Sequence, residues 1–392
     1  MNEPYKPFTD GPDHPTAVRH TQTSKLASPD PITDEEMQTL LAPKLRDGKL
    51  SAVQLDAVVL ARKAHNAGKA FIVGDATGLG KGRTGVGSLY NGFLLDHPET
   101  IGRRAVYFST AKVFETLVRD VRDMCVKASI IDVRNERDRT IPKGMDSILF
   151  VSYYSLSGKP KDGKESAAKF IERYIRGAPN AGKVPMIIDE SHTVKNCYGN
   201  GASASGIAAF QLFHDTRDLT TMTFMSATAA SRMEHLRLYA PFVGFVGDGS
   251  SGGAAGAFIS FDRLNQKLGN NKDASALEFL SAELIRTGCM CSRALGYDGI
   301  TFSEETVNMP AEWRAMHDAA TVVFDRLYDT NLFTGPGRLP HYYSEALRFF
   351  KCLSLSGKVA RTIEVAKDRL SKGMNVVISM MSTGEAAAGR AV

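Results

Sequence analysis

Short apolar segments alternate with helical patterns along the middle of the chain, and this alternation constrains the fold more than any other feature. Helical patterns at 112–124 and 165–176 separate several of the apolar segments. Strands that are apolar along their whole length need cover on both faces, which is typical of parallel sheets. The sequence therefore predicts an α/β fold in which a parallel sheet lies between two layers of helices. The predicted strands are 70–73, 105–108, 129–133, 147–151, 186–188 and 221–225.

Two further helices are predicted before the first strand. Thr33 and Glu36 match a capping box at the start of helix 34–46. Helix 51–66 follows, with apolar residues at helical spacing. Residues 1–32 hold six of the 16 prolines and almost no apolar periodicity, so we expect an extended, polar segment there.

The last third of the chain is predicted to differ from the middle. Residues 247–257 are rich in Gly and Ser and are expected to form a loop. A mainly helical stretch is predicted for 258–350, broken near 335–337. Helix 357–371 and strand 375–380 resemble the first helix and strand of another α/β unit.

Composition argues against several classes of protein. No apolar stretch approaches 18 residues, so we expect no membrane partner, and the first residues lack the apolar region of a secretory signal. The net charge of +5 is too small to indicate a nucleic-acid partner by itself. The five cysteines lack metal-site spacing, and Cys289 and Cys291 are predicted to be core residues rather than half of a zinc site. We expect a reducing compartment, the cytoplasm for a prokaryotic or phage chain and the nucleus for a eukaryotic one.

The sharpest local signal is the run Gly74–Arg83, which follows a predicted strand and opens a predicted helix. This is the context of a phosphate-binding loop. Glycines at 78 and 80 allow a tight turn whose N–H groups point at phosphate oxygens. Lys81 adds a full positive charge for the β- and γ-phosphates.

The run departs from the strict G-x-x-x-x-G-K-[ST] pattern at both ends. Asp75 stands where the first glycine is expected, and Gly82 replaces the hydroxyl residue that normally ligates Mg²⁺. A flexible glycine-rich turn is therefore an open alternative for this segment alone. A dinucleotide fingerprint at Gly80, Gly82 and Gly85 is weaker, because a lysine lies inside it and no acidic residue ends a second strand.

Two further segments carry polar residues at the ends of predicted strands. Asp189 and Glu190 follow an apolar strand, and in nucleotide hydrolases such a pair holds Mg²⁺, usually through water, and polarises the attacking water. Ser226 and Thr228 end another apolar strand and could hydrogen-bond to the carboxylate loop and report nucleotide state. Their order after the phosphate loop makes the combination specific.

In this order the three segments resemble the motifs of superfamily-2 helicases and translocases. Gly78–Lys81 resembles motif I, Asp189–His192 resembles motif II in its DExH form, and Ser226–Thr228 resembles motif III. Gln54 lies where this class has its adenine-reading glutamine. The resemblance implies ATP and Mg²⁺ as ligands, with Lys81, Asp189 and Glu190 as catalytic residues.

The resemblance also implies the remaining site residues. Asp189 would hold Mg²⁺ through water, and His192, Ser226 and Thr228 would couple nucleotide state to the rest of the protein. The expected nucleotide contacts are Gln54, Thr77, Gly78, Leu79, Gly80, Lys81, Gly82 and Arg83.

The strawberry notch family is more closely similar, because its motif I also reads G-D-x-T-G-x-G-K-G-R. Gly82 is therefore interpreted as a family trait, whereas Ser191 departs from the cysteine that is usual in the family. The resemblance runs from about residue 13 to the end of the chain. Further similar stretches are 14–31, 50–58, 120–124, 149–156, 189–196, 226–231, 292–307 and 356–386.

This resemblance implies a domain organisation around a P-loop NTPase. Residues 33–246 would form the first, ATP-binding RecA-like domain, after the extended segment 1–32. Residues 247–350 would be a loop and a mainly helical linker, and 351–392 the truncated beginning of a second RecA-like domain. We therefore expect a fragment, or one part of a split protein, that lacks a C-terminal helicase half and hydrolyses ATP slowly.

Two functions follow from this organisation. The first is a nucleic-acid-dependent ATPase or helicase-like translocase, with DNA favoured over RNA as the partner. The alternative is a scaffold that binds nucleotide or nucleic acid without hydrolysis, which Gly82 and the incomplete second domain favour. The presence of Lys81, Asp189 and Glu190 together favours the enzyme.

Overall fold

The protein is described here by a computed structural model, which divides into two compact units, 1–298 and 299–392. This division differs from the boundaries predicted at 246/247 and 350/351, because residues 290–291 join the central sheet of the first unit and residues 293–295 pair with its N-terminal strand. The structure describes residues 3–96, 99–135, 140–158, 165–179, 182–199, 201–229, 232–244, 261, 263, 266, 274–296, 300–330 and 338–379.

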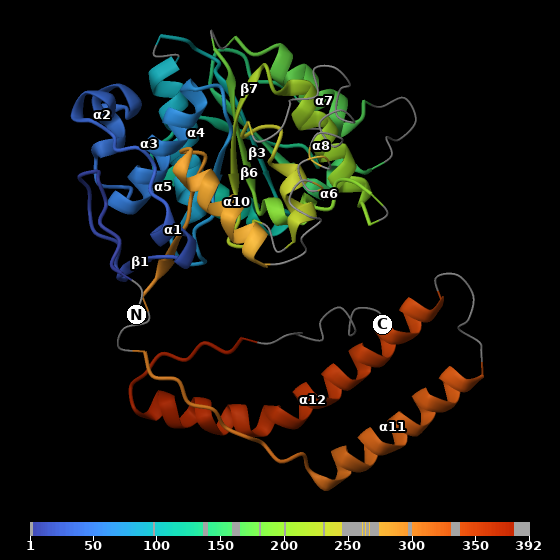
Figure 1. Ribbon diagram of the computed structural model, residues 1–392. Helices are drawn as coiled ribbons and strands as arrows, with labels where there is room; N and C mark the ends of the chain where they lie inside the picture. The colour runs from blue at the N-terminus through green and yellow to red at the C-terminus, as the bar shows by residue number, and fades with distance from the viewer. Residues whose placement is uncertain are drawn as a thin grey trace. The chain divides into compact units, whose positions relative to one another are not determined.

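A parallel sheet of seven strands forms the centre of the first unit, in the order β4-β5-β3-β6-β7-β2-β8 (Figure 1). The predicted parallel α/β fold is confirmed, and all six predicted strands are present with shifts of one or two residues at their ends. The strands are β2 (Phe71–Val73), β3 (Arg104–Ser109), β4 (Ser129–Asp132), β5 (Ser147–Ser152), β6 (Val184–Asp189), β7 (Thr220–Met225) and β8 (Met290–Cys291).

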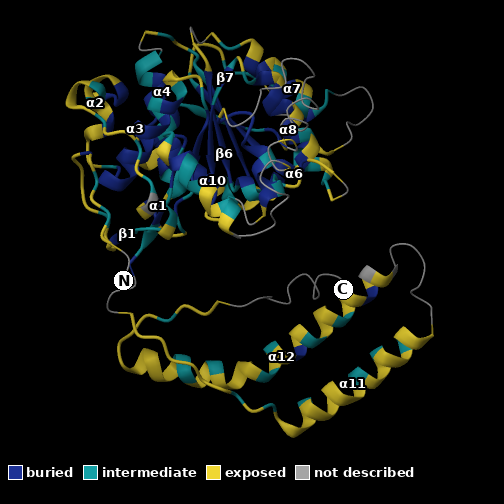
Figure 2. Cartoon of the chain, viewed as in Figure 1, coloured by how far each residue is buried: buried dark blue, intermediate teal, exposed yellow. Residues whose placement is uncertain are grey.

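Helices cover both faces of this sheet (Figure 1). Alternate strand residues enter two separate cores, so that Phe71 and Val73 pack with one helical layer and Ile72 packs with the other. This alternation explains why the strands are buried along their whole length (Figure 2). The first layer holds α3 (Ala52–Asn66), α4 (Lys81–Asp96) and α5 (Phe114–Asp123). The second layer holds α6 (Tyr153–Leu156), α7 (Ala167–Arg176) and α8 (Ala204–Thr216).

The N-terminal region is folded onto this unit, and the short helix at 22–26 departs from the extended segment predicted for 1–32. Strand β1 (Val18–His20) pairs antiparallel with β9 (Arg293–Leu295), and α1 (Gln22–Leu26) follows it. The predicted capping box is present at the start of α2 (Asp34–Leu40). The helix predicted for 34–46 ends early, because Pro43 cannot continue it and begins a separate 3₁₀ turn, η1 (Pro43–Arg46).

Several short elements complete the first unit. The predicted mainly helical stretch 258–350 includes α10 (Ala274–Arg286), but it also contains β8 and β9, which the prediction missed. These strands have two and three residues, and β9 includes the charged Arg293, so neither forms the longer apolar run by which the other strands were predicted. The loop predicted for 247–257 and the break near 335–337 lie outside the described residues. Besides η1, the described residues form the 3₁₀ turns η2 (Ala111–Val113), η3 (Ser191–Val194) and η4 (Met233–Leu238).

In the described part of the second unit, the helices are α11 (Ala311–Asp329) and α12 (Arg338–Ser371). The rings of Phe324 on α11 and Tyr342 on α12 contact each other, and the Tyr342 hydroxyl donates to the Phe324 carbonyl at 2.8 Å. The helix predicted for 357–371 is the last part of α12. The strand predicted for 375–380 is wrong over 375–379, which lack sheet pairing, and Met380 lies outside the described residues.

Candidate nucleotide-binding site

The phosphate loop leaves the carboxyl end of β2 and enters α4 at Lys81. Gly78 and Gly80 have φ angles of +98° and +76°, a region that favours glycine because it lacks a Cβ. A Cβ at Gly78 would lie 2.7 Å from Leu295 Cδ1. Leu79 is buried against Val18, while Thr77, Gly78 and Gly80 are exposed. The loop therefore has a buried anchor and a solvent-facing backbone.

The Lys81 ammonium group lies across this loop. Its Nζ donates to the carbonyls of Asp75 at 2.9 Å and Ala76 at 3.2 Å. The side chain is thus held over the turn at the first residue of a 16-residue helix, whose N-terminus carries partial positive charge. A phosphate bound here would meet both the helix end and the lysine.

Gln54 supports the loop from α3. Its Nε2 donates to the carbonyls of Leu79 at 3.2 Å and Gly80 at 3.3 Å, and its Oε1 accepts from Ser51 N at 3.0 Å. A Cβ at Gly80 would collide with this amide. The glutamine expected to read adenine is therefore next to the phosphate loop and is one of the groups that shape it.

Asp75, which departs from the strict phosphate-loop pattern, forms a buried ion pair. Its Oδ1 accepts from Arg293 Nε at 2.9 Å and its Oδ2 from Arg293 Nη2 at 2.6 Å. Both side chains are at most 3% exposed. Arg293 on β9 also donates to the Val53 carbonyl and lies over the ring of Tyr5. This pair joins the loop to α3, β9 and the N-terminal region.

The same network continues into α3 through Asp56. This buried carboxylate accepts from the Tyr5 hydroxyl at 2.7 Å and from the Thr9 hydroxyl at 2.6 Å. Sequence reasoning missed both Arg293 and Asp56. Each lies in a stretch that resembles the strawberry notch family, and that was the available signal.

Asp189 lies at the carboxyl end of β6. One strand, β7, separates β6 from β2, the strand that precedes the phosphate loop. Met225 of β7 pairs with Asp189 on one side and with Val73 of β2 on the other. Because adjacent strands are about 4.8 Å apart, Val73 and Asp189 are roughly 10 Å apart across the sheet. Asp189 Oδ2 accepts from Ser109 Oγ at 3.0 Å. Burial, together with the charge of Glu190, raises the pKa of Asp189 to about 6.

Glu190 begins the turn after β6 with a φ angle of +50°, which is unusual for a residue with a side chain. Its Oε2 lies 3.2 Å from His192 Nδ1. His192 Nδ1 also lies 3.1 Å from Ser226 Oγ, which accepts from Thr228 N at 3.1 Å. The structure thus brings the predicted carboxylate turn and the Ser-Ala-Thr segment together.

Ser191, the departure from the family's usual cysteine, is fully buried in this turn. Its Oγ lies 2.9 Å from the Tyr239 hydroxyl and donates to the Met225 carbonyl at 3.3 Å. A hydroxyl at this position therefore has hydrogen-bonding partners and ties the turn after β6 to β7.

Gly82 and Arg83 lie in the first turn of α4, next to α5. Arg83 Nη2 lies 3.4 Å from Asp123 Oδ2 and 3.7 Å from Asp120 Oδ1. The Asp189 carboxylate, beside the Ser109 hydroxyl, offers the type of oxygen ligand that Mg²⁺ prefers while it keeps several waters. The arrangement can accept a phosphate chain between a cationic loop and a carboxylate turn.

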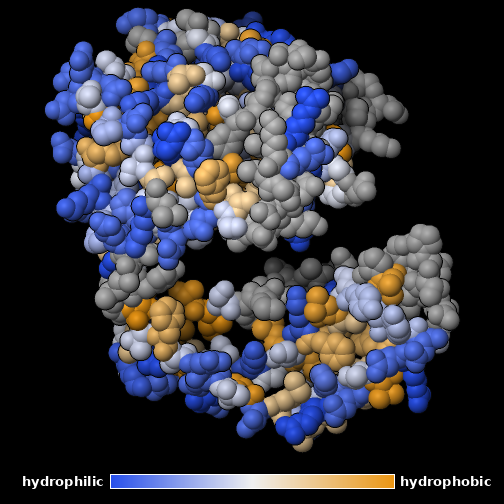
Figure 3. Space-filling view, viewed as in Figure 1, coloured by the Kyte–Doolittle hydropathy of each residue, from blue (hydrophilic) through white to orange (hydrophobic). Residues whose placement is uncertain are grey.

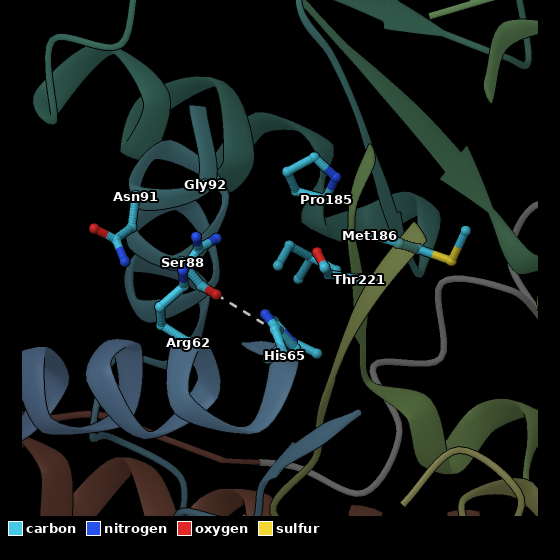
Figure 4. A pocket seen from close by; sticks show the side chains of 10 residues that line it. Arg62, His65, Ser88, Asn91, Gly92, Pro185, Met186 and Thr221 are labelled. Atoms are coloured by element: carbon cyan, nitrogen blue, oxygen red, sulfur yellow. Dashed lines mark hydrogen bonds between the residues drawn. The ribbon is translucent and has the colours of Figure 1, made fainter. Parts of the chain in front are cut away.

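Other features of the first unit lie away from this site. A small cavity of about 10 Å³ between α3, α4, β6 and β7 is lined by Arg62, His65 and Asn91 (Figure 4). It adjoins Pro185 and Thr221 near the amino ends of their strands, opposite Asp189. Cys289 and Cys291 belong to the hydrophobic cores, as predicted. Of the helices in the described ranges, none is long and apolar enough to cross a bilayer.

Comparison with known proteins gives consistent matches. A family model described as "P-loop containing NTP hydrolase pore-1" matches residues 13–319. Protein strawberry notch homolog 1 of Rattus norvegicus is 27% identical over 95% of this chain and 30% of its own length. Protein strawberry notch homolog 2 of Homo sapiens is 26% identical over 96% of this chain and 27% of its own length. The chain thus spans less than a third of these curated relatives.

A solved structure with partial likeness is the Sulfolobus solfataricus SWI2/SNF2 ATPase core in complex with dsDNA. It shares 16% identity with a TM-score of 0.42, over 82% of this chain and 64% of that one. The fold assignment depends instead on the sheet order and on the family match. The chain is similar to the strawberry notch proteins, and it belongs to the P-loop containing NTP hydrolase pore-1 family, with a RecA-like P-loop fold.

Proposed function

We propose that the chain binds ATP with Mg²⁺ at the loop after β2 and hydrolyses it in support of work on nucleic acid, DNA rather than RNA. One observation carries the proposal: β2, β7 and β6 are neighbours, the loop that leaves β2 leads to Lys81, Ser226 follows β7 directly and Asp189 ends β6. The match to a P-loop NTP hydrolase family supports a nucleotide ligand, and the resemblance of the motifs to superfamily-2 helicases supports the choice of ATP and nucleic acid.

Each site residue has a role in the proposed reaction. Lys81 and the N-terminus of α4 bind the β- and γ-phosphates, and Asp189 holds Mg²⁺ through water. The bound ion supplies positive charge against the phosphate oxygens. Glu190 orients the attacking water and accepts its proton as the bond to the γ-phosphorus forms and the bond to the leaving oxygen breaks. The contact of Glu190 with His192 supports a role for that histidine in orienting the base.

The Ser-Ala-Thr segment is proposed to sense the nucleotide. Ser226 bridges His192 and the backbone of Thr228, so a shift of Glu190 would be transmitted to residues 226–228. Gln54 is proposed to contact the nucleotide while it supports the loop. Thr77, Gly78, Leu79, Gly80, Gly82 and Arg83 would contribute the remaining contacts of the phosphate loop.

Full activity is proposed to need an arginine from a second RecA-like domain, as the resemblance to superfamily 2 implies. Such an arginine contributes about 10³–10⁵ in rate in related nucleotide hydrolases. We therefore expect slow turnover by this chain, and faster turnover when the second domain is added in cis or in trans. Strong DNA-stimulated turnover by the purified chain would contradict this part of the proposal.

The second candidate is a scaffold that binds nucleotide or nucleic acid without hydrolysing ATP, which the missing hydroxyl at Gly82 favours. ATP turnover measured with and without DNA or RNA, alongside a Glu190→Gln variant, separates the two candidates. The enzyme predicts turnover that the variant loses. The scaffold predicts nucleotide binding with the same background turnover in both proteins.

A further inference from the structure

Gly82 occupies the position at which a phosphate loop normally has a serine or threonine. The hydroxyl of that residue is a ligand of Mg²⁺ in phosphate-loop proteins. A Cβ built on Gly82 would lie 3.2 Å from Asp120 Oδ2 and 3.9 Å from the Tyr107 hydroxyl. A carboxylate oxygen of α5 therefore lies next to the position where the side-chain hydroxyl would be.

Asp120 is a buried carboxylate whose two oxygens face different surroundings. The residue is 3% exposed. Its Oδ1 accepts from Arg119 Nη2 at 3.1 Å and lies 3.7 Å from Arg83 Nη2. Its Oδ2 is the atom directed at Gly82. The arginines thus balance the charge from one side, while the second oxygen points toward the phosphate loop.

Tyr107 connects this carboxylate to the proposed metal site. The residue lies on β3, which is the neighbour of β6, and its ring is fully buried. Both Asp189 and Asp120 act electrostatically on its hydroxyl, and hydrogen bonding from Tyr107 stabilises the charged form of Asp189. Asp120 and Asp189 therefore flank one buried hydroxyl from two different elements.

We propose that Asp120 replaces the missing hydroxyl of the phosphate loop as an oxygen ligand for the divalent cation that accompanies the nucleotide. This inference depends on the nucleotide site proposed above. Mg²⁺ is a hard cation that binds carboxylate oxygens, directly or through its waters, so an aspartate can serve where a hydroxyl is absent. Glycine at 82 then has a physical reason, because a side chain there would crowd Asp120 Oδ2.

Cation binding is tested with Mn²⁺ in place of Mg²⁺, measured by electron paramagnetic resonance with ADP present. Asp120→Asn keeps the shape of the side chain and removes its charge. We expect Mn²⁺ affinity to fall by at least about 10-fold, the loss typical when a supporting ligand of a metal site is removed. Asp123→Asn is the matched control on the same helix, because it also contacts Arg83 but is more exposed. Unchanged Mn²⁺ affinity in Asp120→Asn would overturn the inference.

A paired variant separates metal binding from a structural role. Restoring the hydroxyl in Gly82→Ser/Asp120→Ala should recover most of the Mn²⁺ affinity that Asp120→Ala loses. No recovery in a folded double variant would count against the inference. Should these variants fail to fold, Fe²⁺-directed backbone cleavage of the unaltered protein with ADP replaces them. We expect backbone cuts near 82, 120 and 189. Cuts near 82 and 189 without any near 120 would contradict the role of Asp120 as a cation ligand.

The same measurements distinguish this inference from the nucleotide site on which it depends. Asp189→Asn should also weaken Mn²⁺ binding. If the unaltered protein shows no nucleotide-dependent Mn²⁺ binding, the nucleotide site itself is wrong and the inference falls with it. If Asp189→Asn weakens binding and Asp120→Asn does not, the inference alone is wrong.

Discussion

The two units of the chain bury their apolar side chains to very different extents. In the first unit, both faces of the sheet are covered, and large side chains such as Phe108, Phe150 and Phe224 are fully buried. In the second unit, the described part of α11 has no buried residue, and Tyr342 and Leu353 are the buried hydrophobic residues of α12. Hydrophobic side chains lie on the surface of this unit (Figure 3).

This difference indicates where the chain can hold a precise site. Local opening costs least where few apolar contacts are made, and most in a densely packed core. The phosphate loop, Asp189 and Glu190 all belong to the first unit, and the buried pair of Asp75 and Arg293 anchors the loop there. We therefore expect nucleotide chemistry and cooperative stability to reside in 1–298.

The largest expected effect is on catalysis by the first unit. In Lys81→Ala the γ-phosphate loses its main charge partner, so productive ATP binding and turnover should be abolished. The matched change in the second unit, Lys358→Ala, alters an exposed lysine of α12 and should leave both unchanged. Nucleotide titration and phosphate release measure the effects. If the two variants bound and hydrolysed ATP equally well, the assignment of the phosphate loop would be wrong.

Stability should show the same contrast. Phe224 is fully buried on β7 among Phe213, Tyr239 and Phe242, so Phe224→Ala should lower the free energy of unfolding by about 3–5 kcal/mol. Phe349 on α12 is 37% exposed, and Phe349→Ala should cost less than about 1.5 kcal/mol. Denaturant unfolding followed by circular dichroism gives both values. Similar losses would contradict the difference in packing.

The buried carboxylate of Asp189 should make the stability of the metal-free first unit depend on pH. Burial raises its pKa to about 6, so the folded state binds the proton more tightly than the unfolded state. The stabilisation is complete below about pH 4 and is lost as pH rises through 6, by about 3 kcal/mol. Asp189→Asn should remove this part of the pH dependence. Parallel curves of stability against pH for the two proteins would show that burial does not raise the pKa of Asp189.

A smaller effect on turnover is expected when Glu190, the proposed general base, is changed. Glu190→Gln should keep Mg²⁺-nucleotide binding while turnover falls by about 10²-fold or more, because the water loses its proton acceptor. Asp189→Asn should instead weaken the Mg²⁺-dependent part of binding. Single-turnover kinetics separate binding from chemistry. Were both variants to hydrolyse ATP like the parent chain, the carboxylate turn would have no catalytic role.

The parallel sheet and the phosphate loop could be predicted because their signals are local. Continuous apolar runs indicate buried strands, and the run from Gly74 to Arg83 contains its glycines and lysine within ten residues. The N-terminal region could not be predicted in this way. It is held by Asp56 and by pairing with β9, and these contacts show no periodicity in the sequence.

The interactions that support the loop were also beyond sequence reasoning. Arg293 and Asp75 are 218 residues apart, and the fold alone brings them together. Asp120 appears in the sequence as one acid among several on an amphipathic helix, and only its position beside Gly82 gives it a chemical meaning. Pairs of this kind depend on the topology of the sheet and of its covering helices.

Hydrogen–deuterium exchange with and without Mg²⁺-ATP shows directly whether the nucleotide site belongs to the first unit. We predict slower exchange at 76–83, 189–192 and 226–228 when nucleotide is present, and unchanged exchange in α11 and α12. Slower exchange confined to α11 and α12, or no change anywhere at saturating nucleotide, would contradict the placement of the site in the first unit.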